Sequence, residues 1–258
     1  MVSVQMSHKQ FFIGALLLMV FAVGCGSAAK KELVNAQFYF DRGMKNMNQK
    51  NYIKALTDFQ TIIESYQTSD LVDRAQFMLA ESHYMNEDYV TAAYEYERVY
   101  ADFPSSEHAV EARYKRALCY YNESPKADLD QENTRFAIDE FTRFIDNFPS
   151  HELSREAQKQ IDELKAKLAY KDFKSAQLYR KLKKYDAALI YYQSVTRDYS
   201  RTTWSDESRF GIGLVYLKQK KFEQAKEVFQ RLVNTTDRKD LKDKSQKKLA
   251  YIENRTKK

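Results

Sequence analysis

One short pattern recurs five times along this chain and restricts the possible folds more than any other feature. An alanine is followed four residues later by an aromatic residue, and another small residue precedes each such pair. The pairs are Ala55/Phe59, Ala92/Tyr96, Ala137/Phe141, Ala188/Tyr192 and Ala225/Phe229, and the preceding small residues are Gly43, Ala80, Ala117, Ala176 and Gly213. Small residues let two antiparallel helices approach closely, and the ring fills the space between repeats. The pattern therefore predicts five helical hairpins stacked side by side.

Composition and turn sequences agree with this prediction. Six glycines and three prolines in 258 residues are few, whereas the abundant Ala, Leu, Lys, Glu and Gln favour helices. Four hairpins close with ESYQTSD, ADFPSSE, DNFPSHE and RDYSRTT, which is typical of tetratricopeptide repeats. We therefore predict an all-α, right-handed tetratricopeptide-repeat superhelix over residues 35–239. Its hairpins are expected at about 35–67, 70–104, 106–149, 152–200 and 203–237.

The spacing of the repeats predicts three further features. The paired alanines lie 37, 45, 51 and 37 residues apart, against a tetratricopeptide unit of 34. The two longer intervals indicate an insertion at Asn122–Thr134 and an extended helix over residues 152–184. Residues 240–258 read as a basic helix and tail, in which Leu241, Leu249 and Ile252 are available to cap the open end of the array.

The first 25 residues are typical of an export signal. A polar start is followed by an apolar or small stretch from Phe11 to Val23, too short for the roughly 20 residues that span a bilayer. Small residues then precede Cys25, as in the bacterial lipobox, whose cysteine is lipidated and becomes the new N-terminus. We expect a signal peptide at 1–24, lipid on Cys25 and a tether at 25–34, with an outer-membrane location facing the periplasm. An ordinary signal peptide with a chance cysteine is the alternative.

The positive charge of the chain is concentrated at its C-terminus. The formal net charge is +6, and residues 231–258 hold ten Lys or Arg against four acidic residues. A nucleic-acid binder usually spreads basic residues over its working face, so no nucleic-acid partner is expected. The basic tail is either a solvated helix or an electrostatic contact with a partner or anionic lipid.

No pattern in the sequence indicates catalysis, a metal or a cofactor. His83, His108 and His151 do not pair with one another or with cysteine at a metal-ligand spacing. With Cys25 lipidated, Cys119 has no intramolecular partner and reads as a small buried apolar residue. The acidic residues of the insertion lack the glycine of a calcium loop and fit a helix N-terminus better. We therefore expect a non-enzymatic protein without cofactors.

A groove for extended peptides is expected along the first helices of the N-terminal hairpins. Repeat arrays bind protein segments on the concave face that these helices line. The predicted groove residues are Phe40, Met44, Met47, Arg74, Phe77, Glu81, Tyr84 and Tyr114. Methionine and aromatic side chains suit varied apolar ligands, and Arg74 is available for a terminal carboxylate. Alternatively, these side chains fill the interior of the superhelix or meet the lipidated N-terminal segment.

The lipobox, five repeats, insertion and long helix together resemble the BamD family of the β-barrel assembly machinery. The resemblance covers about residues 33–235 and is most specific at Leu164–Thr202, where Arg197, Asp198, Tyr199 and Thr202 match the family's R-D-Y-P-x-T turn and Ser200 replaces its proline. The resemblance implies a scaffold lipoprotein that binds BamA, other lipoproteins of the machinery and unfolded outer-membrane proteins. It makes the Arg197–Thr202 turn and the basic tail the candidate BamA side.

Two other interpretations remain open. A periplasmic repeat adaptor such as the Tol–Pal coordinator shares the turns and aromatic hairpins, but it normally carries an N-terminal coiled coil, for which residues 26–36 are too short. An enzyme accessory or peptidoglycan-associated protein would be supported by an appended domain, and the sequence shows none.

Overall fold

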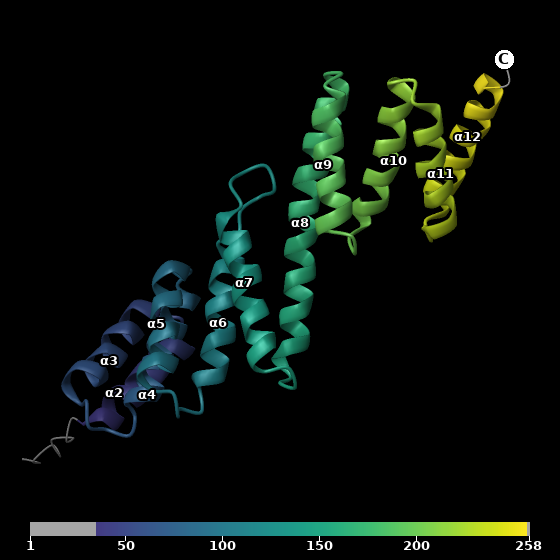
Figure 1. Cartoon of the computed structure of the whole chain (residues 1–258). Coiled ribbons are helices and arrows are strands. Elements are labelled where there is room, and N and C mark those ends of the chain that lie inside the picture. Colours follow the sequence, from purple (N-terminus) through teal and green to yellow (C-terminus); the bar gives the residue numbers. More distant parts are fainter. Residues whose placement is uncertain (1–34, 257–258) are drawn as a thin grey trace, which may run out of the picture.

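The computed structural model describes residues 35–256, and within this range all regular secondary structure is helical. The helices are α2 (Ala36–Asn48), α3 (Tyr52–Ser65), α4 (Val72–Met85), α5 (Tyr89–Asp102), α6 (Ala109–Asn122), α7 (Glu132–Asn147), α8 (Leu153–Lys181), α9 (Tyr185–Asp198), α10 (Thr203–Lys218), α11 (Phe222–Thr235) and α12 (Lys239–Thr256). They form five antiparallel hairpins, α2–α3 to α10–α11, followed by α12 (Figure 1). This confirms the predicted fold. The signal segment and Cys25 lie outside the described residues.

The repeated small residues and rings pack as the sequence predicts. The alanine and the ring of all five pairs are at most 1% exposed. A Cβ added to Gly43 would lie 2.7 Å from Cε1 of Phe59, and one added to Gly213 would lie 2.5 Å from Cζ of Phe229. The ring of the second helix thus occupies the space that a small residue on the first helix leaves free. This contact joins the two helices of each hairpin.

Most hairpin turns have the same backbone conformation. A residue with positive φ follows the first helix at Lys50, Glu87, Lys183 and Lys220, with φ between 59° and 61°. The next amide then donates to a carbonyl in the last turn of that helix, as in Lys184 N to the oxygen of Tyr179 at 2.9 Å. In the third hairpin the insertion, residues 123–131, takes the place of this turn.

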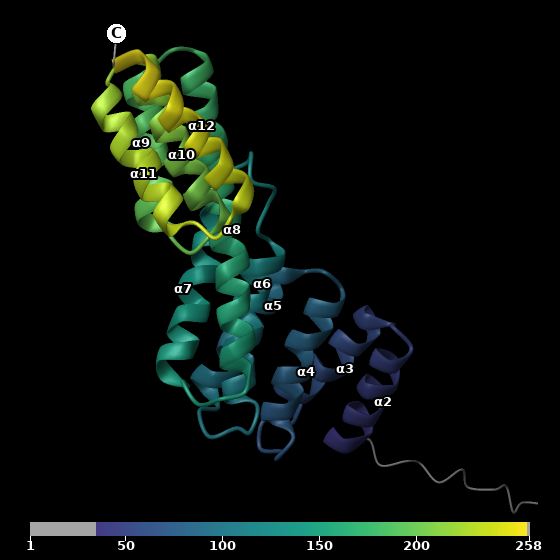
Figure 2. The same ribbon diagram turned by 90° about the vertical axis from the view of Figure 1, so that its right-hand side faces the viewer.

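Helix α8 joins the two halves of the array. Its 29 residues make it the longest of the described helices, as the extended interval predicts. Ile161 and Leu164 of its first half belong to the apolar cluster built with α6 and α7, whereas Phe173 and Ala176 of its second half belong to the cluster with α9 and α10. Figure 2 shows α2–α5 and α9–α12 at opposite ends of the molecule, with α8 between them.

The C-terminal helix covers the last hairpin. Leu241 and Ile252 of α12 are buried against α11, and Leu249 is partly buried beside them. These are the three residues expected to cap the array. In the range 35–256, no helix has the length and apolar character needed to cross a membrane.

Candidate functional site

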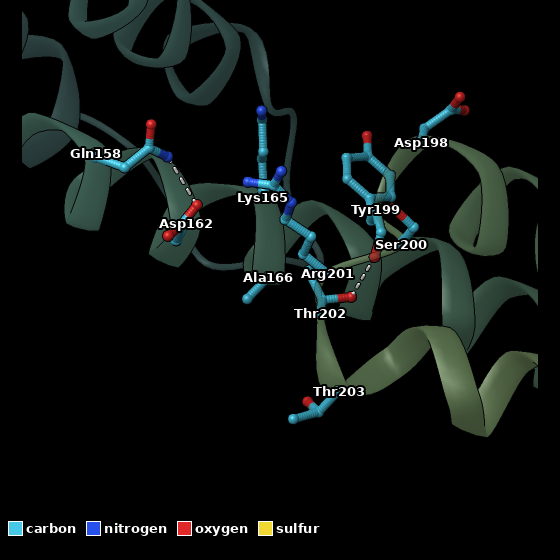
Figure 3. Close-up of a pocket in the computed structure, with 10 residues that line it drawn as sticks. All are labelled: Gln158, Asp162, Lys165, Ala166, Asp198, Tyr199, Ser200, Arg201, Thr202 and Thr203. Atoms are coloured by element: carbon cyan, nitrogen blue, oxygen red, sulfur yellow. Dashed lines mark hydrogen bonds between the residues drawn. The ribbon is translucent and has the colours of Figure 1, made fainter. Parts of the chain in front are cut away.

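A cleft lies between the first half of α8 and the turn that joins α9 to α10. Its volume is about 470 Å³, and Figure 3 shows the residues that line it. One wall is the first half of α8, with Gln158, Asp162, Lys165 and Ala166, and the other is the turn, with Asp198, Tyr199, Ser200, Arg201, Thr202 and Thr203. The second half of α8 packs with α9 and α10, so the turn between these two helices meets the first half of α8 at the cleft.

Local hydrogen bonds hold the turn in one conformation. The amide of Tyr199 donates to the oxygen of Val195 at 3.1 Å and ends α9. Thr202 donates to the oxygen of Tyr199 through both its amide, at 3.0 Å, and its hydroxyl, at 2.8 Å (Figure 3). Thr202 is then the extended residue before α10. The same amide bond closes the two equivalent turns that contain proline, from Ser106 to Phe103 at 3.0 Å and from His151 to Phe148 at 3.1 Å, so the turn keeps it although Ser200 replaces the proline.

The exposed rim of the turn carries an ion pair between neighbours in sequence. Arg197 is 74% exposed and donates to both carboxylate oxygens of Asp198, at 2.8 and 2.9 Å. These hydrogen bonds lower the pKa of Asp198 and raise that of Arg197. Burial of its ring raises the pKa of Tyr199. The turn therefore presents a paired charge at its rim and a half-buried phenol beneath it.

Two cations face the cleft without a carboxylate partner. Figure 3 shows Arg201 extending from the turn toward the α8 side, where Lys165 lies. Among the ion pairs of residues 35–256, neither Lys165 nor Arg201 takes part, whereas Asp162 accepts a hydrogen bond from Gln158 at 2.9 Å. Unpaired cations beside a half-buried ring can receive an acidic side chain of another protein.

The structure distributes the four predicted turn residues unevenly. Asp198, Tyr199 and Thr202 line the cleft, whereas Arg197 lies outside its lining and is held by Asp198. Sequence reasoning missed Arg201 in the same turn and the four residues of α8. The second arginine of the R-D-Y-S-R-T segment and the excess length of α8 are the signals that could have found them.

The expected N-terminal groove needs correction at its aromatic residues. Phe40, Phe77 and Tyr114 are only 6–7% exposed and belong to the apolar core. Each lies three residues before the small position of its helix, so it faces the second helix of its own hairpin. The ring centroids lie 5.8 Å apart for Phe40 and Phe59, 5.9 Å for Phe77 and Tyr96, and 5.6 Å for Tyr114 and Phe141. The expectation that these three rings line an open groove is therefore wrong.

The other groove residues are accessible to different degrees. Glu81 is engaged, because it accepts from the hydroxyl of Tyr96 and pairs with Lys115 at 2.8 Å. Met44 and Tyr84 are half-buried, and so is Met47, whose sulfur accepts from Ser82 at 3.0 Å. Arg74 is exposed, with its guanidinium 5.1 Å from the ring of Phe40. The surface left on α2 and α4 is thus smaller and more polar than the sequence suggested.

The histidines and the remaining cysteine occupy structural positions. His83 lies 3.1 Å from a carboxylate oxygen of Asp88, and His108 stacks on Phe77 with centroids 4.5 Å apart. Cys119 is buried, which raises the pKa of its thiol to about 12. In the described part of the chain, no group of three or more His, Cys, Asp or Glu residues is placed to hold a metal ion.

Comparison with known proteins gives one consistent family. The family model YfiO, described as an outer membrane lipoprotein, matches residues 31–232. The outer membrane protein assembly factor BamD of Caulobacter vibrioides is 24% identical over 219 residues, covering 83% of this chain and 72% of the relative. That of Rickettsia prowazekii is 24% identical over 218 residues, covering 83% and 86%.

Similar solved structures include repeat proteins of low sequence identity. A TPR repeats protein from Bacteroides fragilis superposes with a TM-score of 0.40 at 15% identity, covering 84% of this chain and 88% of the other. A thermophilic TPR protein from Thermus thermophilus gives a TM-score of 0.35 at 14% identity, covering 84% and 100%.

Proposed function

This chain belongs to the YfiO family of outer membrane lipoproteins, which includes BamD, and we propose that it is a non-enzymatic scaffold for the assembly of outer-membrane proteins. The proposal rests on that membership and on the name outer membrane protein assembly factor that its relatives carry. It includes a lipid anchor at Cys25 that holds the array at the periplasmic face of the outer membrane.

The cleft between α8 and the α9–α10 turn is our candidate for the contact with BamA. The observation that carries this assignment is the pair of unpartnered cations, Lys165 and Arg201, on opposite walls of the cleft. An acidic side chain of the partner would bridge them, and the half-buried Tyr199 would add apolar contact. Charge-assisted hydrogen bonds of this kind are roughly twice as strong as neutral ones.

Binding of unfolded outer-membrane protein segments is the second part of the proposal. The accessible residues available for it are Met44, Met47, Arg74 and Tyr84, on the first helices of the two N-terminal hairpins. Exposed Arg74 suits a terminal carboxylate, and the flexible methionines suit varied apolar side chains. Charge reversal at Arg74 is expected to weaken binding of a C-terminal outer-membrane protein peptide while leaving the fold intact. By contrast, Phe77→Asp would unfold its hairpin.

Affinity purification of the full-length tagged protein from detergent-solubilised membranes tests the scaffold. We expect stoichiometric recovery of BamA with the wild type and at least tenfold less with the Lys165→Glu/Arg201→Glu variant. Lys54→Glu/Lys226→Glu, at two exposed lysines of α3 and α11, makes the same change in charge away from the cleft and the basic tail and is expected to retain BamA.

The composition of the purified complex separates the alternatives. Recovery of Tol–Pal or peptidoglycan-linked proteins in place of BamA would overturn the function and leave the fold untouched. Equal recovery of BamA with the cleft variant and with the Lys54→Glu/Lys226→Glu control would retain the scaffold but place the contact elsewhere. Mass spectrometry of the mature N-terminus tests the anchor, because Cys25→Ser must abolish the acyl modification.

A further inference from the structure

The second half of α8 carries a row of lysines and leucines, all exposed except Lys171, which is half-buried. Lys171, Lys174 and Leu178 follow one another at intervals of three or four residues, and Lys181 and Leu182 lie three and four residues after Leu178, so all five lie toward one side of the helix. Leu178 is 55% exposed and Leu182 is 56% exposed. We call this row the basic–apolar stripe. Exposed leucines that recur along one face are uncommon on a surface that meets only water.

The repeat-three insertion lies against this stripe. Lys171 donates to the oxygen of Leu129 at 2.5 Å, and Lys174 lies 3.4 Å from the carboxylate of Asp128. One turn earlier on α8, Lys167 donates to the hydroxyl of Ser124 at 2.8 Å. Since Leu129 is itself 59% exposed, the insertion brings a third solvent-facing leucine to the stripe.

The insertion has a fixed shape because its buried polar side chain is fully hydrogen-bonded. The side chain of Gln131 is 1% exposed and donates to the oxygens of Lys126 at 2.9 Å and Leu129 at 3.0 Å. Its own oxygen accepts from Thr134 at 2.8 Å. A buried, fully bonded amide rigidifies the segment around it. The insertion is therefore a preformed wall.

An open hollow of about 370 Å³ lies on the stripe, with Asp128 of the insertion at its edge. Its lining is Asp128, Lys171, Lys174, Ser175, Gln177, Leu178 and Lys181. Three lysines therefore face one aspartate, so the hollow is cationic, and Leu178 supplies an apolar contact. The single ion pair, Lys174 with Asp128, is exposed and contributes little to stability, so an incoming carboxylate can replace it at small cost.

We propose that this hollow docks an acidic segment of another protein that carries apolar side chains. Carboxylates of the segment would pair with the lysines, and its apolar side chains would cover Leu178, Leu182 and Leu129. A protein segment fits better than a membrane surface because the site is recessed and has the carboxylate of Asp128 at its edge. A flat anionic bilayer would leave the floor of the hollow empty and would meet that carboxylate.

The proposed site is separate from the cleft at the α9–α10 turn. Asp162 in the cleft and Lys171 in the stripe are nine residues apart, which is roughly two and a half turns and places them on opposite sides of α8. The two linings share no residue. The inference does not depend on the proposed BamA contact, because it stands on the stripe and the insertion alone.

Site-specific crosslinking in cells tests the proposal with the full-length chain. A photo-reactive amino acid replaces Leu178, and the same substitution at Ile53, which is 63% exposed on α3, serves as the matched control. We expect a protein adduct at 178 that is absent at 53. Mass spectrometry of the adduct is expected to place the crosslink in a segment of the partner that has net negative charge and apolar residues. Leu182 provides a second position if the first variant does not fold by circular dichroism.

Charge reversal supplies the decisive comparison. Lys171→Glu/Lys174→Glu is expected to reduce the adduct at least tenfold, whereas Lys54→Glu/Lys226→Glu, at exposed lysines of α3 and α11, leaves it unchanged. A synthetic peptide of the mapped segment should show the same ranking in fluorescence anisotropy. Adducts with lipid only, a neutral or basic segment, an adduct equal to the control, or indifference to charge reversal would each overturn the proposal. Variants of Lys165 and Arg201 are expected to leave this adduct unaffected. Failure of the docking site and failure of the proposed BamA contact are therefore distinguishable.

Discussion

Gly211→Ala should destabilise the array although it replaces a glycine inside a helix. In an exposed helix interior this change stabilises by roughly 1 kcal/mol. Here a Cβ would lie 2.5 Å from Cζ, 2.7 Å from Cε1 and 2.9 Å from Cε2 of Tyr192. That ring is 1% exposed and lies beside Phe173, with centroids 6.0 Å apart, so it has no free space to enter. The contact must therefore be relieved by moving α10 away from α9.

The expected net effect follows from two opposing terms. Inserting a methyl group into a packed interior costs roughly 1–3 kcal/mol, and helix propensity offsets roughly 1 kcal/mol of it. We expect a net loss of about 1 kcal/mol, or a fall in melting temperature of roughly 2–4 °C for a chain of this size. The other first helices carry full side chains two residues before their small position, at Asp41, Met78, Lys115 and Lys174. The close approach is thus particular to α10 among the five.

Urea denaturation followed by far-ultraviolet circular dichroism measures the effect. The exposed position Lys226 on α11 calibrates the propensity, because Lys226→Ala should be more stable than Lys226→Gly by roughly 1 kcal/mol. In a Tyr192→Leu background, which removes the ring, Gly211→Ala should cost nothing or stabilise. Stabilisation of the wild type by Gly211→Ala, matching the gain at Lys226, would refute the packing argument.

Three further predictions follow from local structure. Glu87→Gly and Lys183→Gly should each raise the free energy of unfolding by about 0.5–1 kcal/mol, because these residues have φ near 60° and glycine removes the Cβ strain; an unchanged urea midpoint contradicts this. Asp58→Ala should cost about 1–3 kcal/mol by urea titration, since its side chain is 4% exposed and accepts from Arg42 at 2.8 Å and Asn46 at 2.8 Å; a loss below about 0.5 kcal/mol would exclude a structural role. Cys119, whose pKa burial raises to about 12, should resist iodoacetamide at pH 8 in a Cys25→Ser chain and react quickly in urea; rapid labelling of the folded protein would show that the thiol is accessible.

The sequence by itself determined the repeat architecture. Helix periodicity and the contact of a small residue with a ring are local and depend on spacing along the chain. For this reason Gly43, Gly213 and the five alanine–aromatic pairs identified the hairpins correctly. The same reasoning located the insertion and the long helix, because both interrupt a regular interval. It also identified the capping role of Leu241 and Ile252, since an open end of an array must be covered.

Only the tertiary structure decided which side chains face solvent and which surfaces meet. Phe40, Phe77 and Tyr114 have the composition of a binding groove, yet they face their own hairpin, because the direction of a side chain depends on the rotation of its helix against its neighbour. The cleft joins residues of α8 to Arg201, more than 30 positions away, and its existence depends on the length of α8 and the angle at which α9 and α10 return. Such non-local distances are set by packing between helices and leave no periodic trace in the chain.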